Sequence, residues 1–218
     1  MRQVTLEEIV KLTRNTMTTV GSDEVGYGSW CGPLVVCATC LPSDFRDPDI
    51  KDSKSLSRKQ REIIFERYSA NKKHIVVVDS ETIDQRGVFP SLLDGHSEAI
   101  TAIEIGLLSD FTVVVDGTLK IKLGSSVRAY CVPKADTMVP AVALASIFAK
   151  VTRDRMMVEY AKQFPGYGFE KHMGYGTPQH QEALEKLGPC PIHRRSYAPV
   201  ADVIARLNPE PNIMDLFD

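Results

Sequence analysis

Two apolar stretches near the start of the chain predict a pair of neighbouring strands. Residues 18–26, TTVGSDEVG, and residues 33–42, PLVVCATCLP, are rich in β-branched side chains and are separated by glycines. Runs of this length bounded by Gly and Pro are typical of two strands joined by a turn. We therefore expect a β-hairpin here. Helical spacing of the apolar positions in residues 6–15 predicts a helix before it.

Two later runs, HIVVVDS at residues 74–80 and FTVVVDG at residues 111–117, are continuously apolar and then reach an aspartate. Continuous apolar runs are typical of strands that are buried on both faces, so we predict two central strands. Residues 90–108 have helical spacing, which completes a β-α-β unit with a right-handed crossover. A shorter, basic strand is expected over residues 127–133.

Two further helices follow from spacing and from capping residues. Residues 57–71 have helical periodicity, and Ser57 with Gln60 has the pattern of a capping box. Residues 139–164 form the longest predicted helix, and its alanines allow close backbone packing. These alanines are Ala141, Ala143, Ala145 and Ala149.

Together the elements predict an α/β fold with a mixed β-sheet flanked by helices. We expect an N-terminal helix within residues 1–17 and one domain over residues 18–207. Residues 208–218 are interrupted by prolines, so we expect them to form a flexible tail.

Composition narrows the class of protein. The chain has 218 residues, of which 43% are hydrophobic and 25% charged, which suits a globular domain with a core. Its apolar runs are too short to cross a bilayer, and acids occupy the place of a signal peptide's apolar segment. We expect a cytoplasmic, monomeric protein without membrane contact. Cys37 and Cys40 lie three positions apart in a strand, so we interpret them as core residues on opposite faces.

Charge is balanced overall but unevenly distributed. The net charge is −2 at pH 7, yet Lys and Arg are concentrated in residues 51–73 and 118–135. Basic segments can follow a phosphate backbone even in a chain of balanced charge. The alternative, that these segments are solvated faces, remains open at this point.

Four acidic residues lie where regular elements end or begin. Asp23 and Glu24 close the first strand, Asp116 closes FTVVVD, and Asp136 comes just before the longest helix. Sites in α/β sheets form at the carboxyl ends of strands. Four carboxylates in one cleft would raise each other's pKa unless a divalent cation neutralised them.

Oxygen ligands of this kind select Mg²⁺ or Mn²⁺, and two such ions can activate a water molecule for hydrolysis of a phosphodiester. A strand-terminal aspartate is also a common turn or cap residue. Asp79 closes a similar run in VVVDS and has no assigned role. Spacing alone does not decide between these interpretations.

Five segments of the chain, in order, resemble the type 2 ribonucleases H, and most closely the bacterial ribonuclease HII form. The resemblance covers most of residues 18–200. The segments are GSDEVGYGSWCGPLVV, DSKSLS, VVVDG, KADTMVPAVALASIFAKVTRDRMM and YGFEKHMGYGTPQHQEALEKLGPCPIHRRSY. The resemblance implies a ribonuclease H-like fold with a helical C-terminal extension and an active site of four carboxylates and two metal ions.

The implied reaction is endonucleolytic cleavage of the RNA strand of an RNA–DNA hybrid, which leaves a 5′ phosphate and a 3′ hydroxyl. Carried over by position, the four metal ligands are Asp23, Glu24, Asp116 and Asp136. Incision at ribonucleotides embedded in DNA is a second implied activity.

The resemblance also implies substrate contacts. Tyr175 matches a tyrosine that stacks on the sugar beside the cleavage junction, and Lys54 falls on a position near the scissile phosphate. The basic segment PIHRRSY, with His193, Arg194 and Arg195, is expected near the nucleic acid, and a packing role for it remains the alternative.

One turn departs from the family pattern. Ribonuclease HII has Gly-Arg-Gly after the acidic pair, and its backbone reads 2′-hydroxyls at an RNA–DNA junction. Here the turn is Gly26-Tyr27-Gly28, which keeps the glycines but lacks a guanidinium that would contact phosphate or brace the loop. We therefore expect cleavage of long hybrids to be favoured over incision at single ribonucleotides. The related ribonuclease HIII also lacks this arginine, but it carries an N-terminal domain and a glutamate at the fourth metal position.

The last residues, NIMDLFD, resemble peptides that dock replication proteins onto the bacterial sliding clamp. Met214, Leu216 and Phe217 would enter the clamp's pocket. The alternative is a tail that folds back on its own domain.

Three other functions remain as alternatives. One is a hybrid-binding module without catalysis, which would have no reason to gather acids beside phosphate. The second is a phosphotransferase, because VVVDGT resembles a turn of actin-like ATPases, although no Walker-type loop is present. The third is another nuclease of the same fold, such as a junction resolvase.

Overall fold

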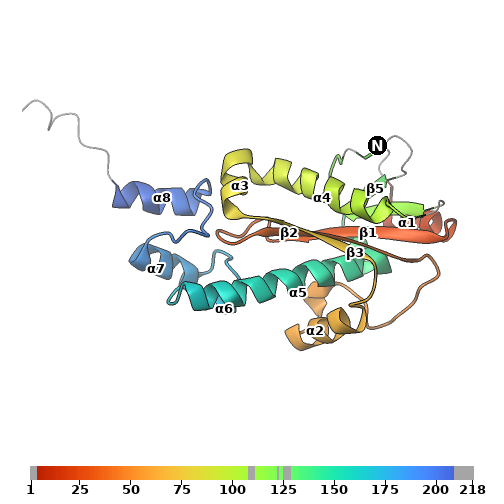
Figure 1. Cartoon of the computed structure of the whole chain (residues 1–218), viewed down its shortest axis with the longest axis horizontal. Coiled ribbons are helices and arrows are strands. Elements are labelled where there is room, and N and C mark those ends of the chain that lie inside the picture. The colour runs from red at the N-terminus through yellow and green to blue at the C-terminus, as the bar shows by residue number, and fades with distance from the viewer. Residues whose placement is uncertain (1–3, 108–110, 122, 125–128, 209–218) are drawn as a thin grey trace, which may run out of the picture.

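The structure is a computed structural model that describes residues 4–107, 111–121, 123–124 and 129–208. Figure 1 shows a sheet covered by helices on both faces, with the last helices beyond one end of it. The strands are β1 (Thr18–Val25), β2 (Leu34–Pro42), β3 (Lys73–Val78), β4 (Phe111–Asp116) and β5 (Ala129–Val132). The helices are α1 (Leu6–Arg14), α2 (Arg58–Arg67), α3 (Ser80–Arg86), α4 (Val88–Glu104), α5 (Pro140–Gln163), α6 (Phe169–His172), α7 (Pro178–Leu187) and α8 (Ala198–Leu207), with 3₁₀ turns η1 (Ser53–Ser55) and η2 (Ala135–Thr137).

The sheet is mixed and has the order β3-β2-β1-β4-β5. β1 and β2 form the predicted antiparallel hairpin, in which Thr18 lies opposite Pro42. β4 lies parallel to β1 and to β5. Helix α4 covers one face of the sheet and α5 covers the other (Figure 1). The expected mixed α/β sheet is confirmed.

The prediction of two central strands is correct for β4 and wrong for β3. β3 lies at the edge of the sheet, where it pairs only with β2, and Val77 on it is 45% exposed. Its apolar run arises because Val76 packs under α4 while Ile75 packs toward α5. A strand covered on two faces has the same sequence pattern whether it is central or at an edge, so the run could not show its position.

Capping residues set where the helices begin. Ser57 and Gln60 form the expected capping box at the start of α2, which ends at Arg67, before the predicted boundary. Helix α3 was not predicted. The Asp79 side chain accepts a hydrogen bond from the Thr82 N–H at its start, so Asp79 is a helix cap.

Close packing of α5 on β1 sets the position of the whole sheet. A Cβ atom on Gly21 would lie 2.2 Å from the backbone of Ala141, so only glycine fits at this crossing. Cys37 packs toward α5 and Cys40 toward α4, which confirms the predicted opposite faces. At the amino end of the chain, Ile9 of α1 is buried against β4 and β5. Among the described residues, no helix is both long and apolar enough to span a bilayer.

We predict that Gly21→Ala destabilises the fold by about 1–3 kcal/mol or more, because the added methyl group overlaps the α5 backbone, which cannot move as a side chain would. Denaturant unfolding of the purified variants measures this loss. Gly28→Ala is the matched control, since a Cβ there meets no atom within 4 Å and its unfolding midpoint should stay near that of wild type. Equal midpoints for the two variants would contradict the packing argument.

Candidate active site

A pocket of about 310 Å³ lies at the carboxyl ends of β1 and β4. The parallel pairing of Ser22 with Val115 brings the next residue of each strand, Asp23 and Asp116, to the same edge of the sheet. Glu24 also lines the pocket. Three cationic side chains complete its rim: Lys54, Arg61 and Lys150. The pocket therefore places acidic side chains next to cationic side chains that could bind a phosphate.

Asp23 is the most enclosed of these acids and is only 6% exposed. Its Oδ1 atom accepts a hydrogen bond from the Glu24 N–H at 2.8 Å, and the Ser146 hydroxyl of α5 also binds it. Burial, followed by the negative charges of Glu24 and Asp116, raises the pKa of Asp23 well above its usual range. Burial and the neighbouring negative charges therefore both disfavour the ionised form of Asp23.

Glu24 faces the other side of the sheet, because side chains alternate along a strand. Its Oε2 atom lies 3.3 Å from Nε2 of His96, a fully buried residue of α4. Since a carboxylate only accepts hydrogen bonds, Nε2 of His96 carries a proton and donates a hydrogen bond to Glu24. The second nitrogen of His96, Nδ1, lies 2.8 Å from the Ser22 hydroxyl. The imidazole therefore fixes the direction of the Glu24 carboxylate.

Asp116 and Asp136 are linked through η2. The Ala135 N–H donates to Oδ1 of Asp116 at 2.7 Å, which places the following residue, Asp136, beside it. Burial raises the pKa of Asp116, and the Glu24 charge adds to this, while the Ala135 N–H and Lys54 oppose it.

Asp136 is 5% exposed and does not itself line the pocket, but it lies within electrostatic reach of Asp116 and Lys54. Burial, then the charges of Asp116 and Asp52, raises the pKa of Asp136 to about 6. A side-chain hydrogen bond with Asp52 contributes to the same shift. All four predicted acids thus belong to one connected electrostatic group.

This donor set fits divalent cations. The pKa values of Asp23, Asp116 and Asp136 are all raised, so a cation among them would relieve the cost of holding these groups ionised. Carboxylate oxygens are the ligands that Mg²⁺ and Mn²⁺ prefer.

The Gly-Tyr-Gly turn lies beside the pocket and is held from inside the protein. Gly26 has a φ of +92°, and a Cβ atom there would lie 2.4 Å from Nε of Arg153, so this position requires glycine. Tyr27 is 42% exposed, and its carbonyl oxygen accepts a hydrogen bond from Nη1 of Arg194 at 2.9 Å. The hydroxyl of Tyr197 donates to the same oxygen.

The structure corrects the expected role of Arg194. This residue is fully buried, and its donors reach the carbonyl oxygens of Tyr27 and Gly32 and the Tyr197 hydroxyl. A place near the nucleic acid was expected for this residue, with packing as the alternative, and its charge is used within the protein to hold the turn. Arg195 is exposed, as a substrate contact requires.

Tyr175 lines the same pocket as the acids. Its ring lies 5.4 Å from the guanidinium carbon of Arg153, a cation–π distance. Arg61 and Lys150 both approach Asp154, at 3.7 Å and 2.7 Å. The charges of these two cations are therefore partly offset within the protein.

Sequence reasoning missed three residues that support the acids: His96, Asp52 and Ser146. Ser146 and Lys150 lie four positions apart in an otherwise apolar part of α5, and this spacing could have indicated a polar face. Asp52 is in the quoted DSKSLS segment, where it also accepts from the Lys54 N–H as the cap of η1. No signal in the sequence links His96 to Glu24, because they are 72 positions apart.

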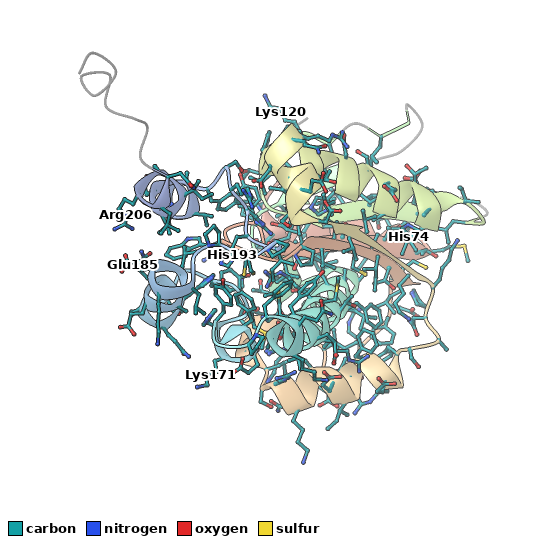
Figure 2. All side chains as sticks on the ribbon, turned by 60° about the vertical axis from the view of Figure 1, so that its left-hand side comes forward. His74, Lys120, Lys171, Glu185, His193 and Arg206 are labelled. Carbon is teal, nitrogen blue, oxygen red and sulfur yellow. The ribbon has the colours of Figure 1, made fainter. Side chains whose placement is uncertain are left out.

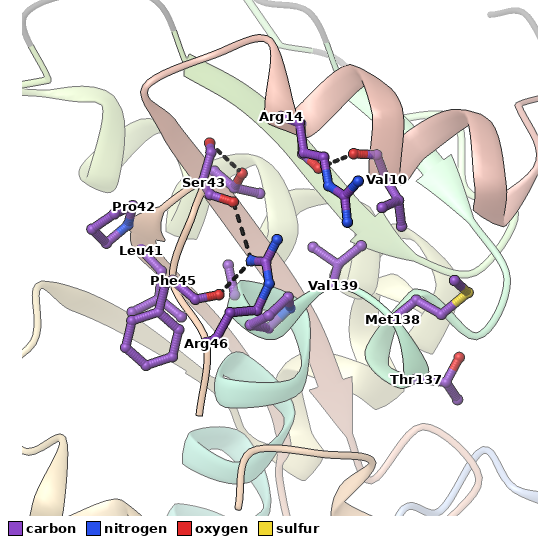
Figure 3. A pocket seen from close by; sticks show the side chains of 14 residues that line it. Val10, Arg14, Leu41, Pro42, Ser43, Phe45, Arg46, Thr137, Met138 and Val139 are labelled. Atoms are coloured by element: carbon purple, nitrogen blue, oxygen red, sulfur yellow. Dashed lines mark hydrogen bonds between the residues drawn. The ribbon is translucent and has the colours of Figure 1, made fainter. Parts of the chain in front are cut away.

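A second pocket, of about 330 Å³, lies at the opposite end of β1, near Thr19 and the start of α5 (Figure 3). Arg14 and Arg46 line it, and Arg46 donates to the carbonyl oxygens of Ser43 and Phe45. No carboxylate is among its described lining residues, so it lacks the donors for metal-dependent chemistry.

Four carboxylates beside a rim of cations, at the carboxyl edge of a mixed sheet, define a metal-dependent nuclease. The family model described as Ribonuclease HII matches residues 20–200. The chain therefore belongs to the ribonuclease HII family, the metal-dependent endonucleases that cleave the RNA strand of RNA–DNA hybrids.

Relatives and solved structures agree with this assignment. The chain is 41% identical to ribonuclease HII of Endomicrobium trichonymphae over 85% of this chain and 88% of that protein. It is 38% identical to a ribonuclease HII of Thermus thermophilus over 91% and 95% of the two chains. Among solved structures, ribonuclease H2 from Pyrococcus horikoshii OT3 matches with a TM-score of 0.71 and 25% identity, over 89% of this chain and all of that one.

Two further structures are similar. One is the PCNA:RNase HII complex from Archaeoglobus fulgidus, with a TM-score of 0.69 and 28% identity over 83% of this chain and 95% of that one. The other is Bst-RNase HIII in complex with Mn²⁺, with a TM-score of 0.70 over 91% of this chain and 73% of that one. At 20% identity the second supports the fold alone.

We predict that His96→Ala weakens metal-dependent cleavage about 10–100-fold, because losing the hydrogen bond behind a metal ligand usually costs this much and Glu24 is one of the expected ligands. The Glu24 carboxylate would lose its buried donor and its fixed direction. Cleavage measured against Mg²⁺ concentration tests this, and excess Mg²⁺ should restore part of the rate. His74→Ala is the control, because His74 pairs with Glu98 on the exposed β3 edge. A Mg²⁺ dependence identical to that of wild type would contradict the role of His96.

Proposed function

We propose that Asp23, Glu24, Asp116 and Asp136 bind two divalent cations, Mg²⁺ or Mn²⁺, and that hybrid cleavage takes place among them. The observation that carries this proposal is the gathering of these acids beside one pocket, where burial and neighbouring negative charges raise the pKa values of Asp23, Asp116 and Asp136. Divalent cations bound there would activate a water nucleophile and stabilise the departing 3′ oxygen. The products would carry a 5′ phosphate and a 3′ hydroxyl.

The other pocket residues then orient the substrate. Lys54 lies near Asp116 and Asp136, where its ammonium group would contact the phosphate at the cleavage site. The ring of Tyr175 is at the pocket wall and would stack on the neighbouring sugar. Arg195 is exposed and would contact the backbone further along the duplex.

We predict that Asp23→Asn and Asp136→Asn each lower hybrid cleavage about 1,000-fold or more while hybrid binding is retained. Metal ions supply several kcal/mol of transition-state stabilisation, and each 1.36 kcal/mol changes a rate tenfold. Single-turnover cleavage of a labelled hybrid, set beside a binding measurement without catalysis, separates the two effects.

Asp79→Asn is the matched control for these variants. Asp79 ends a similar strand but caps α3, and Asn caps a helix as well as Asp does, so folding and cleavage should remain at wild-type levels. Full turnover in Asp23→Asn or Asp136→Asn would remove that residue from the proposed mechanism.

The preference between substrates depends, in our proposal, on the Gly26-Tyr27-Gly28 turn. The backbone of the turn would read 2′-hydroxyls, which needs no arginine. The Tyr27 side chain can stack on a sugar or base but cannot neutralise a phosphate. The enzyme would therefore cleave runs of ribonucleotides more readily than it incises at a single ribonucleotide.

We predict that Tyr27→Arg raises the ratio of single-ribonucleotide incision to hybrid cleavage, because the new guanidinium adds a phosphate contact at the junction. Cleavage mapping on two duplexes, one with a run of ribonucleotides and one with a single ribonucleotide, measures this ratio. Tyr27→Phe keeps the ring without adding charge and serves as the control. An unchanged ratio in Tyr27→Arg would show that the side chain at this position does not set the preference.

A sliding clamp is a proposed partner. Met214, Leu216 and Phe217, the residues expected to bind it, lie outside the described residues. The support is the tail's own sequence and the Archaeoglobus fulgidus relative, whose structure is a complex with PCNA. The cytoplasmic location and the monomeric state also stay predictions.

We predict that deletion of residues 212–218 weakens binding to the bacterial sliding clamp at least tenfold while hybrid cleavage without the clamp is unchanged. The apolar side chains that would fill the clamp's pocket are lost, and none of the four proposed metal ligands is removed. Titration of the clamp against both proteins measures the affinities, and equal values would exclude this role for the tail.

A further inference from the structure

Away from the four acids, three buried side chains with nitrogen and sulfur donors converge. Cys31 lies between β1 and β2, His180 lies in α7, and His193 lies in the segment between α7 and α8. One donor atom from each lies within 4.8 Å of the other two. The Nε2 atoms of the two histidines are 3.1 Å apart. Figure 2 shows His193 in the interior, between the C-terminal helices and the sheet.

The hydrogen bonds behind the two imidazoles suit metal coordination. Nδ1 of His180 lies 3.0 Å from the Tyr175 carbonyl oxygen, and Nδ1 of His193 lies 3.3 Å from the Cys190 carbonyl oxygen. Histidines that bind a metal through one nitrogen commonly donate the other N–H to a backbone carbonyl. The His180 ring can therefore donate through Nδ1 while its Nε2 lone pair faces the shared centre, and the His193 ring can do the same once the Cys190 N–H no longer donates to its Nδ1.

In the absence of an ion, the same atoms form a chain of hydrogen bonds. The Cys190 N–H donates to Nδ1 of His193 at 2.9 Å, so Nε2 of His193 carries the proton and donates it to Nε2 of His180. Binding an ion would move the His193 proton to Nδ1, next to the Cys190 carbonyl. A proton on Nδ1 would also face the Cys190 N–H, which lies 2.9 Å away and points at it, so the Cys190 peptide would have to turn away for the ion to bind.

The neighbouring charges act on Cys31 in two ways. Burial raises the pKa of its thiol, while the guanidinium groups of Arg153 and Arg194 oppose this shift. An ion must displace the thiol proton, and these two cations favour the thiolate that results. They also repel a dication, so we expect weaker binding than in a zinc finger.

We propose that Cys31, His180 and His193 form a structural site for Zn²⁺. Zn²⁺ takes Cys and His ligands in tetrahedral sites. Three protein ligands are one fewer than structural sites usually have, so a water molecule would complete the coordination here. The bound ion would tie α7 and the following segment to the turn that begins at Gly26. It would therefore stiffen the C-terminal helices against the sheet without entering the reaction.

This site differs in chemistry from the carboxylates. Those acids offer oxygen donors, which suit Mg²⁺ and Mn²⁺, whereas sulfur and imidazole donors select Zn²⁺. The Asp136→Asn chain is a useful background for the test, since it weakens the oxygen site and leaves the three donors intact. Because Cys31, His180 and His193 are at most 1% exposed, the ion would enter during folding.

The experiment refolds the full chain, in the Asp136→Asn background, with Zn²⁺ or with a chelator, and then measures retained zinc by elemental analysis after dialysis. We expect one ion per chain, and none with the additional change Cys31→Ala. Cys37→Ala is the matched control, because Cys37 is a fully buried thiol in the core cluster against α5 and is not one of the three donors. That variant should retain the ion.

Thermal unfolding and Co²⁺ absorption give independent readouts. With Zn²⁺ at about one hundred times its dissociation constant, the midpoint should rise by about 5–10 °C, and not in Cys31→Ala. Co²⁺ in place of Zn²⁺ should show a thiolate-to-metal absorption band, and this band should be absent from Cys31→Ala. If the alanine variant does not fold, Cys31→Ser takes its place in both measurements. Equal zinc retention with and without Cys31, or Co²⁺ absorption without a thiolate band, would overturn the proposal.

Discussion

Two buried guanidinium groups hold the turn at Gly26 and the C-terminal extension in place beside the acidic pocket. Arg153 of α5 donates to the carbonyl oxygens of Pro33 and Met173 and to the Ser29 hydroxyl, and Arg194 donates to those of Tyr27 and Gly32. A charged side chain that is buried away from water is tolerated only when its hydrogen-bond donors meet acceptors. Most of the acceptors are backbone carbonyl groups of the β1–β2 turn and of the C-terminal extension. Arg153 and Arg194 therefore join three segments that are far apart in the sequence: α5, this turn and the extension.

Within this arrangement, Arg153 contacts both the turn at Gly26 and the ring of Tyr175. The Arg153 side chain lies against Gly26, where a Cβ would collide with it, and its guanidinium also lies over the Tyr175 ring. The Arg153 side chain therefore positions both the turn and Tyr175 relative to the acids. The position of the acids depends instead on α5, since Gly21 allows β1 to touch its backbone and Ser146 reaches Asp23 from the same helix.

The sequence predicted the features that depend on local patterns. The hairpin, the Ser57–Gln60 capping box and the long α5 are encoded in neighbouring residues, and the four acids stood out because each lies at the end of an element. Features that depend on pairing across the fold were not predicted. The edge position of β3 is a property of the sheet, and the bond between His96 and Glu24 joins residues that only folding brings together. Arg194 is the clearest case, because its charge suggested a surface role and its burial is visible only in three dimensions.

Burial of Arg194 also shows how the turn is held with a tyrosine at position 27, where the resemblance to ribonuclease HII leads us to expect an arginine. An exposed guanidinium at that position could act in two ways, by bracing the loop or by contacting phosphate. Here the bracing is supplied from inside, since Arg194 and Tyr197 hold the Tyr27 carbonyl oxygen and Arg153 packs against Gly26. The Tyr27 side chain is exposed and takes no part in that bracing. The contacts that hold the turn therefore do not involve the side chain at position 27.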